Sequence, residues 1–181
     1  IAKLQATMNG SNIVYIENPK QPDFEAMKVE TNTLPQLREL SIMASPDFGV
    51  IFSDNKYLIL DRKSGKESQD LIGMSDQIKV YALKLLLKKK RKAELGDTEI
   101  EGYEVYLPST HSHGGKIEQK DIDEIIEKIV QDTSFQKTFL VDQDAVKNQP
   151  LASKMFSRTN NEKKCENCTF RKVCGMLKHF E

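Results

Sequence analysis

Two short apolar runs, at residues 48–52 and 57–60, constrain the fold of this chain more than any other feature of its sequence. Both runs are rich in β-branched and aromatic side chains, and Ser53-Asp54-Asn55-Lys56 separates them. The pattern predicts two antiparallel strands joined by a tight turn. Because successive side chains of a strand point to opposite faces, this hairpin also determines which of the flanking polar residues can meet.

Three charged residues flank the open end of the predicted hairpin. Asp61 and Lys63 are two residues apart at the end of the second run and therefore share a face, while Asp47 comes just before the first run. A loop of odd length centred on Asp54 would place Asp47 opposite Asp61 on that face, with their Cβ atoms about 5 Å apart. A loop of even length would place the two carboxylates on opposite faces, unless a β-bulge corrected the register.

Two carboxylates and a lysine at one place suit the hydrolysis of a phosphodiester. Carboxylate oxygens are hard ligands that favour Mg²⁺ or Mn²⁺, and these ions take only one or two carboxylates from a protein. The metal polarises the scissile phosphate and lowers the pKa of a bound water, and Lys63 can orient that water or offset charge on phosphorus. The alternative interpretation is structural: Asp47 begins a turn, and residues 61–63 are a solvated strand end.

Further motifs around these residues resemble the PD-(D/E)xK nuclease superfamily, specifically its RecB-like branch. Pro46-Asp47 matches the first acidic motif of that family, and Asp61-Arg62-Lys63 matches the second. Ser64-Gly65-Lys66 is the usual continuation of the second motif, and Gln77-Ile78-Lys79-Val80-Tyr81 matches the Q-x-x-x-Y helix motif. The resemblance covers the nuclease core and implies a restriction-endonuclease-like fold.

The resemblance also implies a role for each of five residues. Asp47 and Asp61 would bind the metal, Lys63 would be catalytic, and Gln77 and Tyr81 would face the site or the nucleic acid. The spacing of the last two residues agrees with that role, because residues at i and i+4 of a helix lie on one face and can reach a common target.

A second motif lies near the C-terminus, where Cys165, Cys168 and Cys174 are the three cysteines of the chain. Three thiols within ten residues, without an apparent secretion signal, indicate a metal or cluster rather than disulfides, because an odd number cannot pair completely within one chain. The C-x2-C-x5-C spacing resembles the last three ligands of the 4Fe-4S cluster in AddB-type and some CRISPR-associated nucleases. That family takes its fourth cysteine from upstream of the core, where this chain has none.

Three alternatives follow for the missing ligand. The fourth cysteine lies outside this chain, or the site holds zinc with a non-cysteine ligand such as His179, or the thiols bind no metal. The chain begins at Ile1 and shows no counterpart of the family's N-terminal helix before residue 12. We therefore expect it to be a fragment of a longer protein.

The chain has 27 basic and 27 acidic residues among 181, so its formal net charge is zero. No global basic field can hold nucleic acid, and any affinity must come from local patches. One candidate is Lys84 with residues 88–92, at the end of a helix predicted to begin near Met74. These cations are either a solvated helix end, favoured by the helix dipole, or a track for phosphates. No apolar stretch approaches the about 20 residues of a membrane span, and no signal segment begins the chain, so we expect a cytoplasmic protein.

The remaining pattern predicts an α/β fold with a central mixed sheet flanked by helices. Residues 12–16, 37–44 and 102–107 are expected to add strands to the hairpin, and residues 120–132 form an amphipathic helix whose isoleucines should cover the sheet. His111 and His113 lie in a Gly-rich segment and are expected to form a hairpin loop rather than a metal site. We expect a nuclease core at residues 1–145 and a connector with the cysteine segment at residues 146–181.

The sequence therefore predicts a metal-dependent DNA nuclease, with exonuclease favoured by the resemblance. DNA would be its substrate, and a helicase or a repair or CRISPR component would be its partner or fused domain. Two other hypotheses remain: a catalytically silent nuclease-like module that binds nucleic acid or protein, and a zinc-stabilised interaction domain. Silent members typically lose one of the three charged residues, whereas Asp47, Asp61 and Lys63 are all present.

Overall fold

The computed structural model describes residues 13–16, 26–28, 33–38, 40–53, 55–65, 73–89, 92–107, 109, 111–152, 155–156, 161, 163–164 and 168. The chain divides into two compact units, residues 1–132 and 133–181. Within the described part of the chain, no helix has the length and apolar character needed to cross a membrane.

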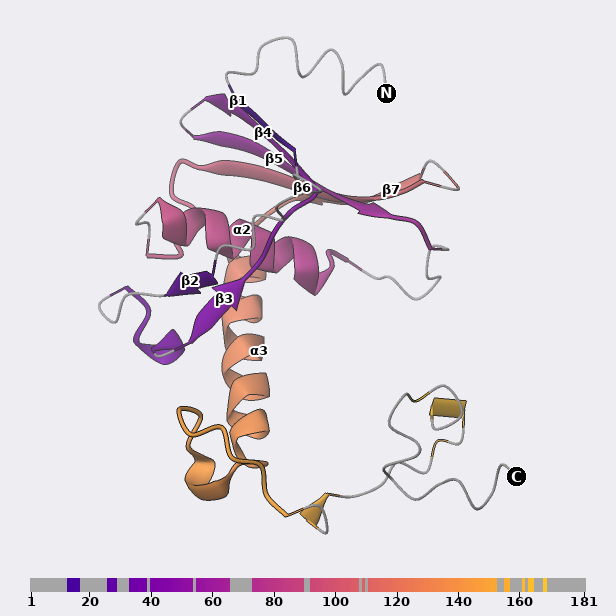
Figure 1. The fold of residues 1–181 in the computed structure, drawn as a ribbon. Helices are drawn as coiled ribbons and strands as arrows, with labels where there is room; N and C mark the ends of the chain where they lie inside the picture. The colour runs from indigo at the N-terminus through magenta and orange to yellow at the C-terminus, as the bar shows by residue number, and fades with distance from the viewer. Residues whose placement is uncertain are drawn as a thin grey trace. The chain divides into compact units, whose positions relative to one another are not determined.

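A five-stranded mixed sheet forms the centre of the first unit (Figure 1). Its strands, in spatial order, are β1 (Ile13–Ile16), β4 (Phe48–Ser53), β5 (Lys56–Lys63), β6 (Glu99–Tyr106) and β7 (His111–Lys116). β5 and β6 are parallel, and the other neighbouring pairs are antiparallel. The mixed sheet with its helices confirms the predicted α/β, restriction-endonuclease-like fold class.

The predicted hairpin is formed by β4 and β5, and its register explains how Asp47 reaches the site. Phe48 pairs with Leu60 and Ile51 with Tyr57, whereas Ser53 pairs with Lys56, so Phe52 is the extra residue of a β-bulge. Two residues separate the strands, and the loop is therefore even in length. The bulge compensates for the even loop and leaves Asp47 facing Asp61 on the continuation of the register.

Helix α2 (Asp76–Lys88) connects the parallel strands β5 and β6 and lies along one face of the sheet (Figure 1). The Ser75 hydroxyl caps it by accepting a hydrogen bond from the Ile78 backbone N–H, at 3.4 Å. Ile78 and Leu86 are fully buried in the core that α2 shares with Ile100 of β6. Because parallel strands share one direction, this connection brings the ends of β5 and β6 and the start of α2 to one edge of the sheet.

Helix α3 (Gln119–Lys137) confirms the predicted amphipathic helix. In the first unit, Ile122, Ile125 and Ile126 of its opening turns join the core beneath the sheet. Lys79 of α2 lies 3.3 Å from Asp121 and 2.6 Å from Glu124, so ion pairs join the two helices beside that core.

The prediction for residues 37–44 was wrong in part, because this segment adds no strand to the central sheet. It contains the end of a 3₁₀ helix, η1 (Pro35–Leu37), and the short strand β3 (Ser41–Met43). β3 pairs with β2 (Ala26–Lys28) in a separate two-stranded sheet. The edge of β4 is already paired with β1, and Leu37, Ile42 and Ala44 are buried instead in the core that includes α2, whereas Met43 is exposed.

The prediction of a loop at His111 and His113 was also wrong, because both residues lie in strand β7. His111 pairs with Tyr106 and His113 with Glu104. Gly114, at φ +139°, allows β7 to approach β6 closely, since a Cβ atom there would overlap the Gly102 carbonyl. Gly114, which resembles a loop residue in the sequence, therefore marks a close approach of two strands.

The second unit contains the end of α3 and the 3₁₀ turn η2 (Val141–Gln143). Phe139 packs edge to face on Phe135, with ring centroids 4.9 Å apart, and stacks on Phe156 at 5.5 Å. Of the predicted metal-binding cysteines, Cys168 is half-buried with a free thiol. Cys165 and Cys174 lie outside the described residues.

Gly102 controls how closely α2 approaches β6, and its substitution tests that packing. A Cβ atom at residue 102 would overlap Cγ2 of the fully buried Ile78. Gly102→Ala should therefore lower the free energy of unfolding by about 1–3 kcal/mol, measured by urea denaturation. Gly115→Ala is the matched control, because Gly115 pairs with Gly102 and a Cβ atom there meets nothing within 4 Å. Equal stability of the two variants would contradict this account.

Candidate active site

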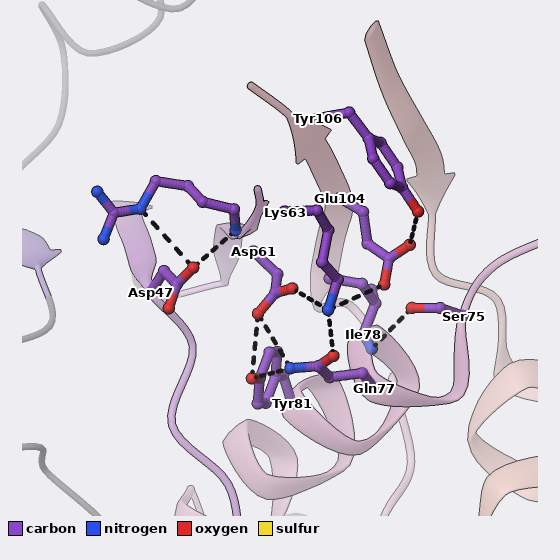
Figure 2. Close-up of polar contacts among 10 residues, drawn as sticks. Asp47, Asp61, Lys63, Ser75, Gln77, Ile78, Tyr81, Glu104 and Tyr106 are labelled. Carbon is purple, nitrogen blue, oxygen red and sulfur yellow. Dashed lines mark hydrogen bonds and ion pairs between the residues drawn. The ribbon is translucent and has the colours of Figure 1, made fainter. Parts of the chain in front are cut away.

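Asp61, near the end of β5, is the buried centre of a polar cluster (Figure 2). Its side chain is 5% exposed. Oδ1 accepts hydrogen bonds from Gln77 Nε2 at 3.0 Å and from the Tyr81 hydroxyl at 3.2 Å. Oδ2 accepts no well-directed hydrogen bond, and the Lys63 ammonium lies 2.6 Å from it. Charge attraction to Lys63 therefore compensates the burial of this oxygen.

The Lys63 ammonium is surrounded by three acceptors. Nζ lies 2.6 Å from Asp61 Oδ2 and 3.6 Å from Glu104 Oε1, and it donates to Gln77 Oε1 at 2.5 Å. Burial lowers the pKa of Lys63, but the contact with Asp61 and the charges of Asp61 and Glu104 raise it more, so the pKa lies above its ordinary value of 10.5. At neutral pH Lys63 is an ammonium, which can donate protons in hydrogen bonds and offset negative charge but cannot act as a base.

Gln77, in the first turn of α2, connects the other members of the cluster. Its amide oxygen accepts from Lys63, while its amide nitrogen donates to Asp61 and to the Tyr81 hydroxyl, the latter at 2.6 Å. The i,i+4 spacing thus brings Gln77 and Tyr81 to the common target that the sequence suggested. Burial raises the pKa of Tyr81 to about 12; the Gln77 hydrogen bond opposes this shift, and the charge of Asp61 adds to it. Tyr81 is therefore a neutral phenol.

Asp47 lies at the rim of the cluster. Its Oδ2 accepts a hydrogen bond from the Arg62 backbone N–H at 2.7 Å and lies 3.7 Å from Arg62 Nε. The side chain is 21% exposed, which leaves it accessible to a ligand. The strand register and these contacts hold Asp47 beside β5, on the side away from β6.

Glu104 of β6 joins the cluster from the other side, and the sequence analysis missed it. Glu104 pairs with Asp61 in the parallel register of β5 and β6, and its side chain is 6% exposed. Its Oε2 accepts a hydrogen bond from the Tyr106 hydroxyl at 3.3 Å (Figure 2). Alternation along residues 102–106 would have placed Gly102, Glu104 and Tyr106 on one face, but it does not indicate which strand lies beside them.

The charge pattern of the site fits a divalent cation. Asp61 Oδ2 is a buried oxygen without a directed hydrogen bond, which is a suitable ligand for a cation, and Asp47 offers a second carboxylate at the rim. Among the described residues, no three His, Cys, Asp or Glu side chains are arranged to hold a metal together. One or two carboxylates with several waters is the coordination that Mg²⁺ accepts in proteins.

The lysines near the end of α2 differ in exposure, although the sequence grouped them in one basic patch. Lys84 is buried and donates to the Ala44 carbonyl, so it supports the packing of residues 40–44 and does not line the surface. Lys88 and Lys89 are exposed, and the Lys89 ammonium lies 4.4 Å from the centre of the Tyr57 ring. Residues 90 and 91 lie outside the described part of the chain.

The raised pKa of Tyr81 predicts a dependence of stability on pH in protein freed of metal by a chelator. Tyrosine titrates near 10 when unfolded and at about 12 here, so its contribution is complete below pH 10 and is lost as the pH rises toward 12. Between about pH 9 and pH 11, the wild type should lose about 1 kcal/mol more stability than Tyr81→Phe. Urea unfolding, monitored by circular dichroism at several pH values, measures the dependence of the free energy of unfolding on pH for both proteins. Parallel slopes would show that Tyr81 titrates normally.

Comparison with known proteins assigns this geometry to a family. No curated protein and no solved structure matches the chain. The sequence does match the PD-(D/E)XK nuclease superfamily over residues 2–175, which includes every residue of the cluster. Nucleases of this superfamily generally use divalent metal ions, in agreement with the carboxylates found here. With nearly its whole length matched, the chain belongs to the PD-(D/E)XK nuclease superfamily.

Proposed function

We propose that this nuclease is a RecB-like, Mg²⁺- or Mn²⁺-dependent deoxyribonuclease. One observation carries the proposal: the Lys63 ammonium lies 2.6 Å from the buried carboxylate of Asp61, at the edge of the sheet where β5, β6 and the start of α2 meet. An acidic and a cationic group fixed side by side can bind a metal and a phosphate at adjacent positions.

The residues of the cluster divide the work of phosphodiester hydrolysis. Asp47 and Asp61 would hold the ion, which when bound polarises the phosphate and supplies an activated water. Lys63, an ammonium in the metal-free site, would orient the attacking water or offset charge that develops on phosphorus. Gln77 fixes the rotamers of Lys63 and Asp61 through its amide, and Tyr81 donates to Asp61 as a neutral phenol. The substrate therefore meets a site that is already ordered.

The substrate and partners are proposed from the sequence motifs. The RecB-like resemblance favours DNA as the substrate, digestion from an end, and work beside a helicase or within a repair or CRISPR complex. Lys88 and Lys89 at the exposed end of α2 supply local positive charge on a neutral chain. The same helix carries Gln77 and Tyr81, so a strand leaving the site could follow α2 toward these lysines.

A catalytically silent binding module is the alternative function, and the geometry disfavours it. A module that only binds has no need of a buried carboxylate with an oxygen that lacks a directed hydrogen bond. Lys63 compensates the charge of that oxygen at 2.6 Å, and a buried carboxylate beside a specific cationic partner is characteristic of functional sites.

Substitution of Lys63 tests the proposed activity. Lys63→Ala should reduce Mn²⁺-dependent cleavage of linear DNA by about a hundredfold or more, because it removes the charge aimed at the phosphate. Asp61→Asn should weaken Mn²⁺ binding as well, measured by calorimetry. Lys56→Ala is the matched control, because Lys56 lies at the other end of β5 in an exposed pair with Glu99. Wild-type protein that binds DNA without cutting it would support the silent module.

We further propose, from their spacing, that Cys165, Cys168 and Cys174 bind a 4Fe-4S cluster, with zinc as the alternative. Protein that carries this segment together with the fourth ligand and is purified without oxygen should contain iron and acid-labile sulfide and absorb visible light, and Cys168→Ser should lose them. Zinc without sulfide would support the alternative. Metal-free protein with a protease-resistant C-terminal segment would show that the cysteines are structural thiols.

A further inference from the structure

Two buried carboxylates on neighbouring strands share one ammonium. Asp61 of β5 and Glu104 of β6 are paired in the parallel register, and Lys63 Nζ lies 2.6 Å from one and 3.6 Å from the other. Both side chains are nearly inaccessible, at 5% and 6% exposure, whereas Lys63 is 29% exposed. Figure 2 shows the ammonium between the two carboxylates.

Occupation of Asp61 by a divalent cation changes this balance. Asp61 would be a ligand of that cation, and Lys63 Nζ lies 2.6 Å from its Oδ2, so the positive charge of a bound ion would weaken the hold of Asp61 on the ammonium. Lys63 would keep the neutral amide oxygen of Gln77 as an acceptor, but it would need a second anion to compensate its charge inside the site. Glu104 is the second carboxylate that the structure places against Nζ.

Glu104 is also held in a fixed orientation. The Tyr106 hydroxyl donates to Oε2, and Oε1 is the oxygen near Lys63. Tyr106 is buried, so its ring fixes the position of the hydroxyl. A carboxylate fixed in this way can direct an ammonium, as second-sphere partners orient the ligands of metal sites.

We propose that Glu104 is a positioning residue that retains Lys63 in the site when Asp61 is engaged by the metal, and that Tyr106 orients Glu104. Glu104 does not touch the substrate and acts through Lys63. This inference rests on the proposed nuclease activity and extends the site to a third strand.

Strand β6 contains its own matched control. Glu101 and Tyr103 form the same i,i+2 carboxylate–phenol pair, with the Tyr103 hydroxyl 3.1 Å from Glu101. Alternation along the strand places this pair on the face away from Asp61, and Glu101 is exposed. Glu101→Gln and Tyr103→Phe therefore repeat the chemical changes of Glu104→Gln and Tyr106→Phe without contact with Lys63.

The test combines steady-state cleavage of linear DNA with Mn²⁺ affinity by calorimetry and thermal unfolding. Glu104→Gln should lower kcat by about 10–100-fold, with KM and Mn²⁺ affinity unchanged. Glu104→Asp should recover part of kcat, Tyr106→Phe should lower it less, and the control variants should match the wild type. In crystals grown with Mn²⁺, Lys63 Nζ should lie about 3 Å from Glu104 Oε1.

Several results would overturn the inference. Wild-type kcat in folded Glu104→Gln would show that Lys63 needs no second anion, and a loss of Mn²⁺ affinity would make Glu104 a metal ligand instead. If Glu104→Gln unfolds, wild-type kcat in Tyr106→Phe together with Lys63 turned away from Glu104 in the Mn²⁺ crystals would reject the proposal. A wild-type protein that cuts no DNA would instead refute the proposed function, so the two failures are distinguishable.

Discussion

The buried carboxylate of Asp61 is the constraint on which the rest of the site depends. An ionised group that loses its water must recover equivalent interactions from the protein. Lys63 supplies the opposite charge, and Gln77 and Tyr81 supply hydrogen bonds to the other oxygen. All three partners contact the Asp61 carboxylate, and its need for compensation explains why residues from a strand and a helix converge on it.

The parallel pairing of β5 and β6 makes this convergence possible. A hairpin alone would bring together Asp47, Asp61 and Lys63, but it could not add groups from a third strand. The crossover through α2 returns the chain beside β5 in the same direction, so Glu104 lies level with Asp61, and Gln77 in the first turn of α2 reaches Asp61 and Lys63. The site thus combines residues of β5 with Asp47, which precedes its antiparallel neighbour, β4, and with Glu104 of its parallel neighbour, β6.

Much of this arrangement could be predicted from local periodicity. Alternation places Asp61 and Lys63 on one face, and the i,i+4 spacing places Gln77 and Tyr81 on one helical face, because both patterns are properties of a single element. Glu104 could not be predicted in this way, since its partner depends on strand order and register. The prediction for the strand β3 failed for the same reason, because its segment packs in the core with α2, which is distant in sequence. The prediction for the histidines of β7 failed because Gly114 resembles a loop residue, whereas it allows a close approach to the preceding strand β6.

The bulge at Phe52 has a consequence for how this hairpin can change during evolution. Insertion or deletion of a single residue between β4 and β5 would shift the pairing by one position and turn Asp47 to the opposite side of the sheet. Two compensating changes would restore it. The number of residues between Asp47 and Asp61 can therefore vary only in steps of two unless another bulge restores the register, while between the strands Asn55 is constrained by its hydrogen bond to Asp97.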